Sequence, residues 1–260
     1  YGRSKGNLTM KPILIVKLGS STPTLAQSHG DFEDWIEARL CLPPGQVAVV
    51  DPQRAPLPEP RHFSGVILTG SHSMVTDHEP WSERTARWIP AVMEAQTPLL
   101  GICYGHQLIA YALGGEVGPN PRGRESGTVE IMLRDEARAD PLFAALPATF
   151  RAHASHAQSV LRLPPGAAWL GFNSHDPHHA YTVGRSTWCV QFHPEFDELA
   201  MRTYIDVCAD ELRVQGDAPA QLHASIAETP HSEELLRRFA AIAAAGGQRS
   251  VSDAANSSPL

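Results

Sequence analysis

The chain has 260 residues, of which 42% are hydrophobic and 19% charged, and its formal net charge is −7. This balance suits one large domain or two small ones, and it argues against nucleic-acid binding, which needs clustered Lys and Arg. No apolar run reaches the roughly 18 residues of a membrane span, and no signal peptide opens the chain. The few scattered cysteines form no CxxC pair, which argues against a disulfide framework and favours a cytoplasmic protein; they are Cys41, Cys103, Cys189 and Cys208.

Short apolar runs alternate with amphipathic stretches in the first half of the chain. Residues 1–9 precede the first methionine and are expected to be an expression remnant. Pro90 is expected to kink or divide the helix that contains it. The alternation predicts a parallel, twisted sheet with helices on both faces. Its strands are predicted at 12–18, 46–51, 65–70 and 97–103, and its helices at 31–40, 80–96 and 104–115.

After Gly115 the pattern changes to short strand-like runs separated by Gly, Pro, Asn and Asp, which predicts antiparallel strands beside the main sheet. These runs lie at 127–133, 149–155, 158–163, 167–173, 178–184 and 187–192. Helices are predicted at 197–216 and 232–245. The expected fold class is α/β: an open, mostly parallel, flavodoxin-like three-layer sheet with additional antiparallel strands. One domain is expected at 10–215, a helical extension at 216–245 and a disordered tail at 246–260.

The stretch G-I-C-Y-G places Cys103 where an apolar strand turns into a helix. A nucleophile at such an elbow needs small neighbours because the turn is tight, and Gly101 and Gly105 supply them. The helix N-terminus favours the thiolate, and the N–H of Tyr104 is placed to face an oxyanion. A buried structural cysteine is the alternative interpretation.

The stretch V-Q-F-H-P-E-F offers a base and a group that orients it. His193 follows an apolar strand, and Glu195 comes two residues later, so on an extended segment both side chains lean the same way. A carboxylate in this position holds the imidazole tautomer and stabilises its charged form. A surface turn is the alternative for this tripeptide alone, but its presence together with the elbow favours a catalytic pair.

The motifs G-I-C-Y-G-H-Q and Q-F-H-P-E together make the chain resemble the class I glutamine amidotransferases, over roughly residues 12–213. The resemblance implies that Cys103 attacks the side-chain amide of glutamine, that His193 relays protons and that Glu195 orients His193. It also implies an oxyanion hole formed by backbone N–H groups of Gly70, Ser71 and Tyr104. Gln107 is expected to help bind the substrate, although a partly buried structural glutamine is the alternative. No cofactor is expected.

Two features depart from the family pattern. Gly70-Ser71-His72 stands where the family often has Gly-Gly-Pro, and a serine at positive φ would cost about 1–2 kcal/mol. The sequence also lacks the Ser-Gly-Gly-x-Asp-Ser pyrophosphatase loop of GMP synthase and any P-loop. It is therefore expected to contain the ammonia-producing half of such a synthetase and not the ammonia-using half.

The segment N-S-H-D-P-H-H (173–179) carries three histidines but lacks helical or zinc-finger spacing, so a solvated hairpin is predicted there rather than a metal site. His156, in A-S-H-A-Q, matches a family landmark and receives no chemical role. No metal ligands are predicted anywhere in the chain.

Several functions fit these motifs. The first is a glutaminase that supplies ammonia to a separate synthetase subunit, and the second is a free-standing hydrolase of γ-glutamyl peptides or amides. A catalytically silent binding or regulatory module is a further alternative, as is another kind of cysteine hydrolase on a similar sheet. The complete set of Cys103, His193 and Glu195 favours the hydrolase interpretations over the last two.

Overall fold

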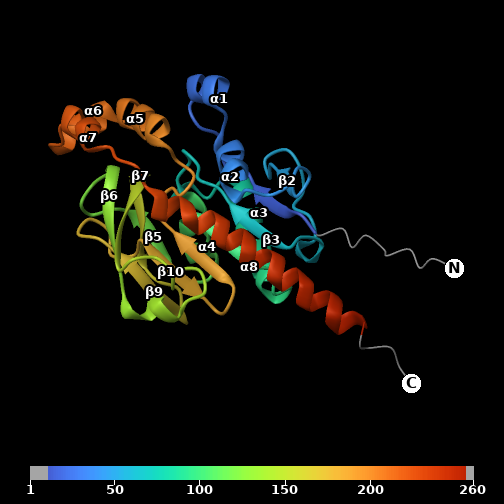
Figure 1. Ribbon diagram of the computed structural model, residues 1–260. Coiled ribbons are helices and arrows are strands. Elements are labelled where there is room, and N and C mark those ends of the chain that lie inside the picture. Colours follow the sequence, from blue (N-terminus) through green and yellow to red (C-terminus); the bar gives the residue numbers. More distant parts are fainter. Residues whose placement is uncertain (1–10, 256–260) are drawn as a thin grey trace.

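The computed structural model describes residues 11–255. The predicted remnant at 1–9 and residues 256–260 of the predicted tail lie outside the described residues. The fold is a nine-stranded sheet in the order β2-β1-β3-β4-β11-β10-β9-β6-β7, beside a two-stranded sheet of β5 and β8 (Figure 1). The strands are β1 (Ile13–Val16), β2 (Val47–Val50), β3 (Gly65–Leu68), β4 (Leu99–Ile102), β5 (Glu116–Pro119), β6 (Glu125–Leu133), β7 (Thr149–His156), β8 (Gln158–Arg162), β9 (Ala167–Phe172), β10 (Ala180–Val183) and β11 (Thr187–Val190).

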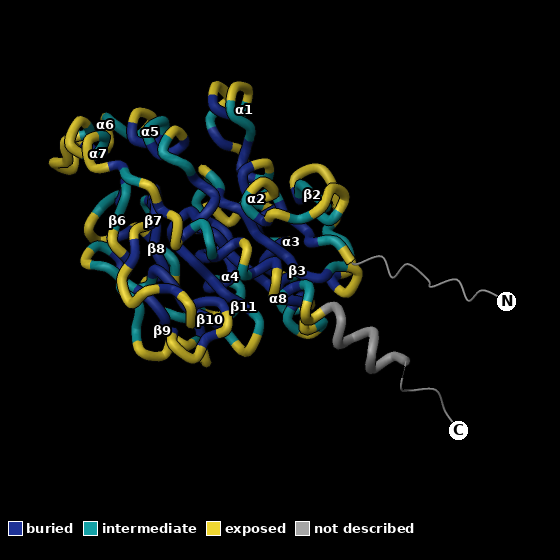
Figure 2. Tube along the Cα trace, viewed as in Figure 1, coloured by how far each residue is buried: buried dark blue, intermediate teal, exposed yellow. Residues whose placement is uncertain are grey.

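Helices cover both faces of the sheet, as the alternating pattern predicted. The helices are α1 (Pro23–His29), α2 (Phe32–Leu40), α3 (Pro80–Glu94), α4 (Tyr104–Ala112), α5 (Glu198–Val207), α6 (Ala209–Gln215), α7 (Pro219–Ser225) and α8 (Pro230–Ala255), with short 3-10 turns η1 (Pro60–His62), η2 (Val75–Asp77) and η3 (Asp135–Ala139). Ile13 and Ile15 of β1 face the core under α2 and α8, whereas Leu14 and Val16 face the core under α3 and α4. Every residue of β1 is therefore buried, which explains its uninterrupted apolar run. Figure 2 shows buried residues gathered in the middle of the molecule and exposed residues at its periphery.

The sheet is mixed, and one of its late strands differs from the prediction. The antiparallel part was expected to contain all strands of the second half, but β11 pairs in parallel with β4, with Val190 opposite Ile102. On its other edge β11 is antiparallel to β10. The strand lies inside the sheet because its four residues are all buried and need neighbours on both edges and both faces.

Three predicted helices differ from the observed ones in their ends or in whether they are continuous. Pro90 does not divide α3, because Ile89 and Val92 on either side of it are fully buried in the core and hold the helix together. The predicted helix at 197–216 breaks at Cys208 into α5 and α6, and both halves bury side chains in one cluster with α2. Helix α8 runs from Pro230 to Ala255, so it begins two residues before the predicted helix at 232–245 and ends beyond it.

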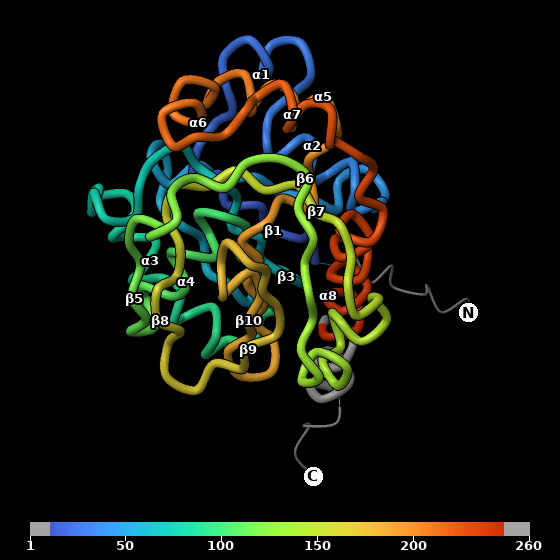
Figure 3. Tube along the Cα trace, turned by 90° about the vertical axis from the view of Figure 1, so that its left-hand side faces the viewer, coloured from blue at the N-terminus to red at the C-terminus, as the bar shows by residue number. Residues whose placement is uncertain are grey.

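Helix α8 belongs to the core of the sheet. Leu235, Leu236 and Phe239 are fully buried, and the helix runs across one face of the sheet in contact with α2 (Figure 1). At one end of the molecule, α1 and α5–α7 form a cap (Figure 3). Among residues 11–255, no helix has both the length and the apolar character needed to cross a membrane.

The turn between β4 and α4 depends on close packing of backbone atoms. A Cβ at Gly105 would lie 2.5 Å from the carbonyl oxygen of Leu68, and one at Gly101 would lie 2.7 Å from the backbone of Gly105. Since real Cβ atoms do not approach this closely, larger residues at these positions would push helix α4 away from β3 and β4. The two glycines of the G-x-C-x-G motif are therefore required by packing, as predicted.

Replacing Gly105 with alanine is expected to lower the free energy of unfolding by about 1–3 kcal/mol, since the Leu68 carbonyl cannot move away cheaply. Gly246→Ala in α8 is the matched control, because its Cβ would meet nothing closer than 3.7 Å. That substitution is expected to raise the free energy of unfolding by about 0.5–1 kcal/mol through helix propensity. Urea unfolding of both variants measures the difference, and effects of the same sign would contradict it.

Candidate active site

Cys103 occupies the turn between β4 and α4, as the motif predicted. Its backbone has φ 50° and ψ −100°, a conformation that non-glycine residues seldom adopt. The turn is held because the N–H of Cys103 donates to the carbonyl of Val190 (2.9 Å) and the N–H of Gly105 donates to that of Thr69 (3.2 Å). The neighbouring strands therefore impose the strained conformation, which places the thiol at the carboxyl ends of the parallel strands.

His193 and Glu195 follow β11 and lie beside this turn. His193 Nδ1 is 2.7 Å from Glu195 Oε1, and both side chains are almost completely buried. The backbone N–H of His193 donates to the carbonyl of His153 (2.8 Å), and its ring stacks on Phe196 with 4.0 Å between ring centroids. Glu195 therefore accepts a hydrogen bond from Nδ1–H of His193, which leaves Nε2 free of Glu195. His193 and Cys103 line the same pocket.

Cys103 and His193 shift each other's pKa in opposite directions. Burial alone would raise the pKa of Cys103, but the charge and hydrogen bond of His193 outweigh it and lower the pKa of the thiol. Burial alone would lower the pKa of His193, but the Glu195 carboxylate and the thiolate raise it to about 10. Each group therefore favours the charged form of the other, a thiolate beside an imidazolium, which is the pairing of a nucleophile with a proton donor.

The residues predicted to form an oxyanion hole lie around this thiol. A Cβ at Gly70 would be 3.0 Å from Cε1 of His193 and 3.8 Å from Cβ of Cys103, so Gly70 allows the backbone to approach both. Ser71 is not among the residues of positive φ in the described part of the chain, and the strain considered for it is absent. Tyr104 begins α4, where N–H groups lack partners within the helix.

Gln107 lines the same pocket, but its side chain is engaged within the protein. Its amide Nε2 donates to the carbonyl of Gln158 (2.8 Å) and to Oε1 of Gln191 (3.0 Å). Both amide hydrogens are therefore used to join α4 to the pocket wall. This geometry favours the structural alternative, and a role in substrate binding stays a prediction.

The pocket includes residues that sequence reasoning did not identify. Phe32, His72, Arg124 and Tyr204 line it together with Cys103, and they come from four separate parts of the chain. Arg124 is the one arginine or lysine among the described residues of this lining, and its Nε donates to Glu211 (2.7 Å). Nothing in the local sequence marks these residues, because α2, the loop after β3, the segment before β6 and α5 come together only in the folded chain.

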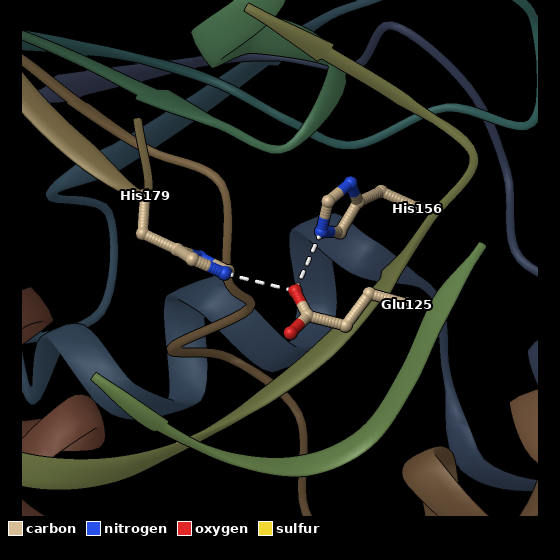
Figure 4. Close-up of side chains that lie close together, drawn as sticks. All are labelled: Glu125, His156 and His179. Carbon is tan, nitrogen blue, oxygen red and sulfur yellow. Dashed lines mark hydrogen bonds and ion pairs between the residues drawn. The ribbon is translucent and has the colours of Figure 1, made fainter. Parts of the chain in front are cut away.

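The histidine-rich segment 173–179 is not the solvated hairpin that was predicted. The side chains of Asp176 and His179 are fully buried, because the segment folds inward against β6 and β7. His179 and His156 both contact Glu125 (Figure 4). The turn residues within this segment predict only its local structure. They do not indicate that Glu125, on the distant strand β6, supplies a buried carboxylate to its histidine.

Comparison with known proteins decides the family. The family model for "Glutamine amidotransferase class-I" matches residues 28–205, which is more than half of the chain. The chain belongs to this family. A solved glutamine amidotransferase from Thermotoga maritima has the same fold, with a TM-score of 0.71 over 90% of this chain and 98% of that one at 20% identity.

Three relatives show the range of names in the family. The GMP synthase of Thermomicrobium roseum is 37% identical over 161 residues, which are 57% of this chain and 28% of that protein. A glutamine-hydrolysing GMP synthase subunit of Ignicoccus hospitalis is 32% identical over 171 residues, 63% of this chain and 86% of the relative. Gamma-glutamyl peptidase 4 of Arabidopsis thaliana is 29% identical over 146 residues, 55% and 58% of the two chains. The chain therefore matches only about a quarter of the full-length Thermomicrobium roseum synthase.

Glu195→Gln is expected to reduce the negative charge that raises the pKa of His193 to about 10. The imidazolium is then lost at a lower pH, because the carboxylate that stabilises it is gone. The midpoint of the His193 ring-proton NMR titration should therefore move to lower pH. The control is Glu198→Gln, an exposed carboxylate three residues away; an equal shift in both variants would contradict the prediction.

Proposed function

We propose that this glutamine amidotransferase hydrolyses the γ-amide of glutamine or of a γ-glutamyl compound, with Cys103 as nucleophile, His193 as acid and base, and Glu195 as the residue that orients His193. The observation that carries the proposal is the buried thiol on a strained turn beside an imidazole whose pKa is raised to about 10. Membership of the family supports it.

The reaction proceeds in two steps. The Cys103 thiolate attacks the γ-carbonyl carbon, and the tetrahedral intermediate collapses as the His193 imidazolium donates its Nε2 proton to the leaving nitrogen. Ammonia, or an amine from a γ-glutamyl compound, departs and leaves a γ-glutamyl thioester. Neutral His193 then removes a proton from water, the resulting hydroxide attacks the thioester, and glutamate leaves as the thiolate is restored.

Backbone N–H groups stabilise the oxyanion of both tetrahedral intermediates. The donors are those of Tyr104, at the start of α4, and of the Gly70–Ser71 turn, which lies against His193. Donors fixed by the strands need no reorganisation as charge develops on the oxygen, so they favour the transition state over the ground state.

Arg124 is proposed to recognise the α-carboxylate of the substrate. It belongs to the lining of the pocket that holds Cys103, and its side chain is 14% exposed. A guanidinium matches a carboxylate in shape and charge. Arg124 Nε donates a hydrogen bond to Glu211, which fixes one edge of the guanidinium group and leaves its two terminal nitrogens for a ligand.

Two physiological roles are compatible with this chemistry. Similarity to the GMP synthase subunit of Ignicoccus hospitalis supports a role beside a separate synthetase that accepts the ammonia. Similarity to gamma-glutamyl peptidase 4 of Arabidopsis thaliana supports a free-standing hydrolase of γ-glutamyl compounds.

Glutamate release from glutamine and from a γ-glutamyl dipeptide, measured with the purified chain, distinguishes these roles. Cys103→Ala is expected to lose at least about 10⁴-fold in kcat, as removal of a nucleophile does elsewhere. Cys41→Ser, at an exposed thiol, is the control and should keep full activity. Preference for the dipeptide supports the free-standing hydrolase. Turnover that persists in Cys103→Ala contradicts the mechanism, as does a chain inactive on both substrates.

Arg124→Gln is expected to raise KM for glutamine by about tenfold or more while kcat changes little, because a charged hydrogen bond in the ground state and transition state is lost. Arg122→Gln, two residues away and exposed, is the matched control. Steady-state kinetics with glutamine measures both. A fall in kcat at unchanged KM would contradict the assignment of Arg124 to carboxylate binding.

A further inference from the structure

Three buried side chains from distant parts of the chain converge beside the active site. His156 Nε2 lies 2.9 Å from Glu125 Oε2, and His179 Nε2 lies 2.8 Å from the same oxygen. The exposed fractions of the three side chains are 7% for Glu125, 1% for His156 and 0% for His179. Figure 4 shows both imidazoles pointing toward the one carboxylate, and their ligand atoms all lie within 4.8 Å of one another.

In Glu125 and His156, the side-chain atom that faces away from the cluster is hydrogen-bonded, as it commonly is in metal ligands of proteins. Asn173 Nδ2 donates to Glu125 Oε1 (2.6 Å), and His156 Nδ1 donates to the carbonyl of Gln158 (2.9 Å). A metal-bound histidine commonly donates its second N–H to a backbone carbonyl, and a metal-bound carboxylate is itself hydrogen-bonded. These contacts aim Nε2 of His156 and Oε2 of Glu125 at a common point.

The charge of the cluster also favours a cation. A second carboxylate, Asp176, is fully buried next to it, with Oδ2 at 3.9 Å from His156 Nδ1 and without a hydrogen-bond partner among the described residues. His179 Nδ1 likewise has no partner there. The two buried carboxylates carry two negative charges, which a divalent ion bound by neutral imidazoles would balance.

We propose that Glu125, His156 and His179 form a binding site for a divalent transition-metal ion. Two imidazole nitrogens and one carboxylate oxygen are a ligand set that suits Zn²⁺ and related first-row ions. A tetrahedral ion with bonds of about 2.0–2.1 Å holds its ligands about 3.3 Å apart. The two N···O distances of 2.9 and 2.8 Å therefore lengthen by roughly half an ångström when the ion replaces the protons between these atoms.

The ion would brace the wall of the active-site pocket. His156 and Gln158 both line that pocket, and the carbonyl of Ser155 lies 3.9 Å from the Cys103 sulfur. Gln107 donates to the same Gln158 carbonyl that accepts from His156. The three ligands come from β6, β7 and the segment before β10, so one ion ties three strands of the sheet together at this wall.

Titration of the purified chain with Co²⁺ and with Zn²⁺ tests the site. The Cys103→Ala variant is used throughout, since the active-site thiol and His193 are themselves competent ligands. We expect one Co²⁺ per chain, with visible d–d bands and no thiolate-to-metal charge transfer. Zn²⁺ is expected to displace the Co²⁺ and to raise Tm, because an ion that binds only the folded chain stabilises it.

Second substitutions in this background locate the ion. Glu125→Gln preserves the shape of the side chain, and His179→Ala removes a ligand; each should weaken Co²⁺ binding at least tenfold. His178→Ala is the matched control, because this neighbouring histidine contacts the Val160 carbonyl and not Glu125. Its Co²⁺ spectrum and affinity should match those of the Cys103→Ala parent.

Three results would overturn the proposal. The first is a Cys103→Ala chain that takes up no stoichiometric Co²⁺ or Zn²⁺, which would leave the cluster as a hydrogen-bonded network alone. The second is binding of equal strength in Glu125→Gln, which places the ion elsewhere even if His179→Ala fails to fold. The third is a Co²⁺ spectrum with thiolate charge transfer, which assigns the ion to one of the remaining cysteines.

Discussion

The candidate active site depends on keeping the Cys103 thiol and the His193 imidazole next to each other while both are buried. Burial opposes both charges, and only their mutual attraction together with Glu195 reverses it for His193, whose pKa rises to about 10. The stability that this histidine contributes is complete below its ordinary pKa of 6.5 and is lost as the pH rises toward 10. Phe196 packs on the His193 imidazole, and the backbone N–H of His193 donates a hydrogen bond to the carbonyl of His153. These contacts hold His193 beside Cys103.

The sheet topology explains how two motifs about ninety residues apart meet. Strands β4 and β11 run in parallel with Ile102 opposite Val190, so Cys103 and His193 emerge at the same edge. If β11 had been antiparallel to β4, His193 would lie at the opposite end of the sheet. The parallel register thus matters more for the chemistry than the identity of any one core residue, and helix α8 supports it by covering one face of these strands.

The same wall of the pocket carries two different chemical arrangements. The carbonyl of Ser155 lies 3.9 Å from the Cys103 sulfur, and the next residue of β7, His156, contacts Glu125. Because the two residues are adjacent in one strand, contacts that hold His156 in place also position the Ser155 backbone beside the thiol.

Much of the local structure was determined by the sequence itself: the strands of the parallel half, the elbow with its two glycines, and the short distance between His193 and Glu195 follow from apolar runs and residue spacing. Tertiary structure alone decided the direction of β11, the unbroken helix through Pro90, the break at Cys208 and the burial of His179. It also decided which distant residues, such as Arg124, line the pocket. The physical reason is that spacing along the chain encodes local geometry, whereas burial and charge pairing between distant segments exist only after the whole sheet has assembled.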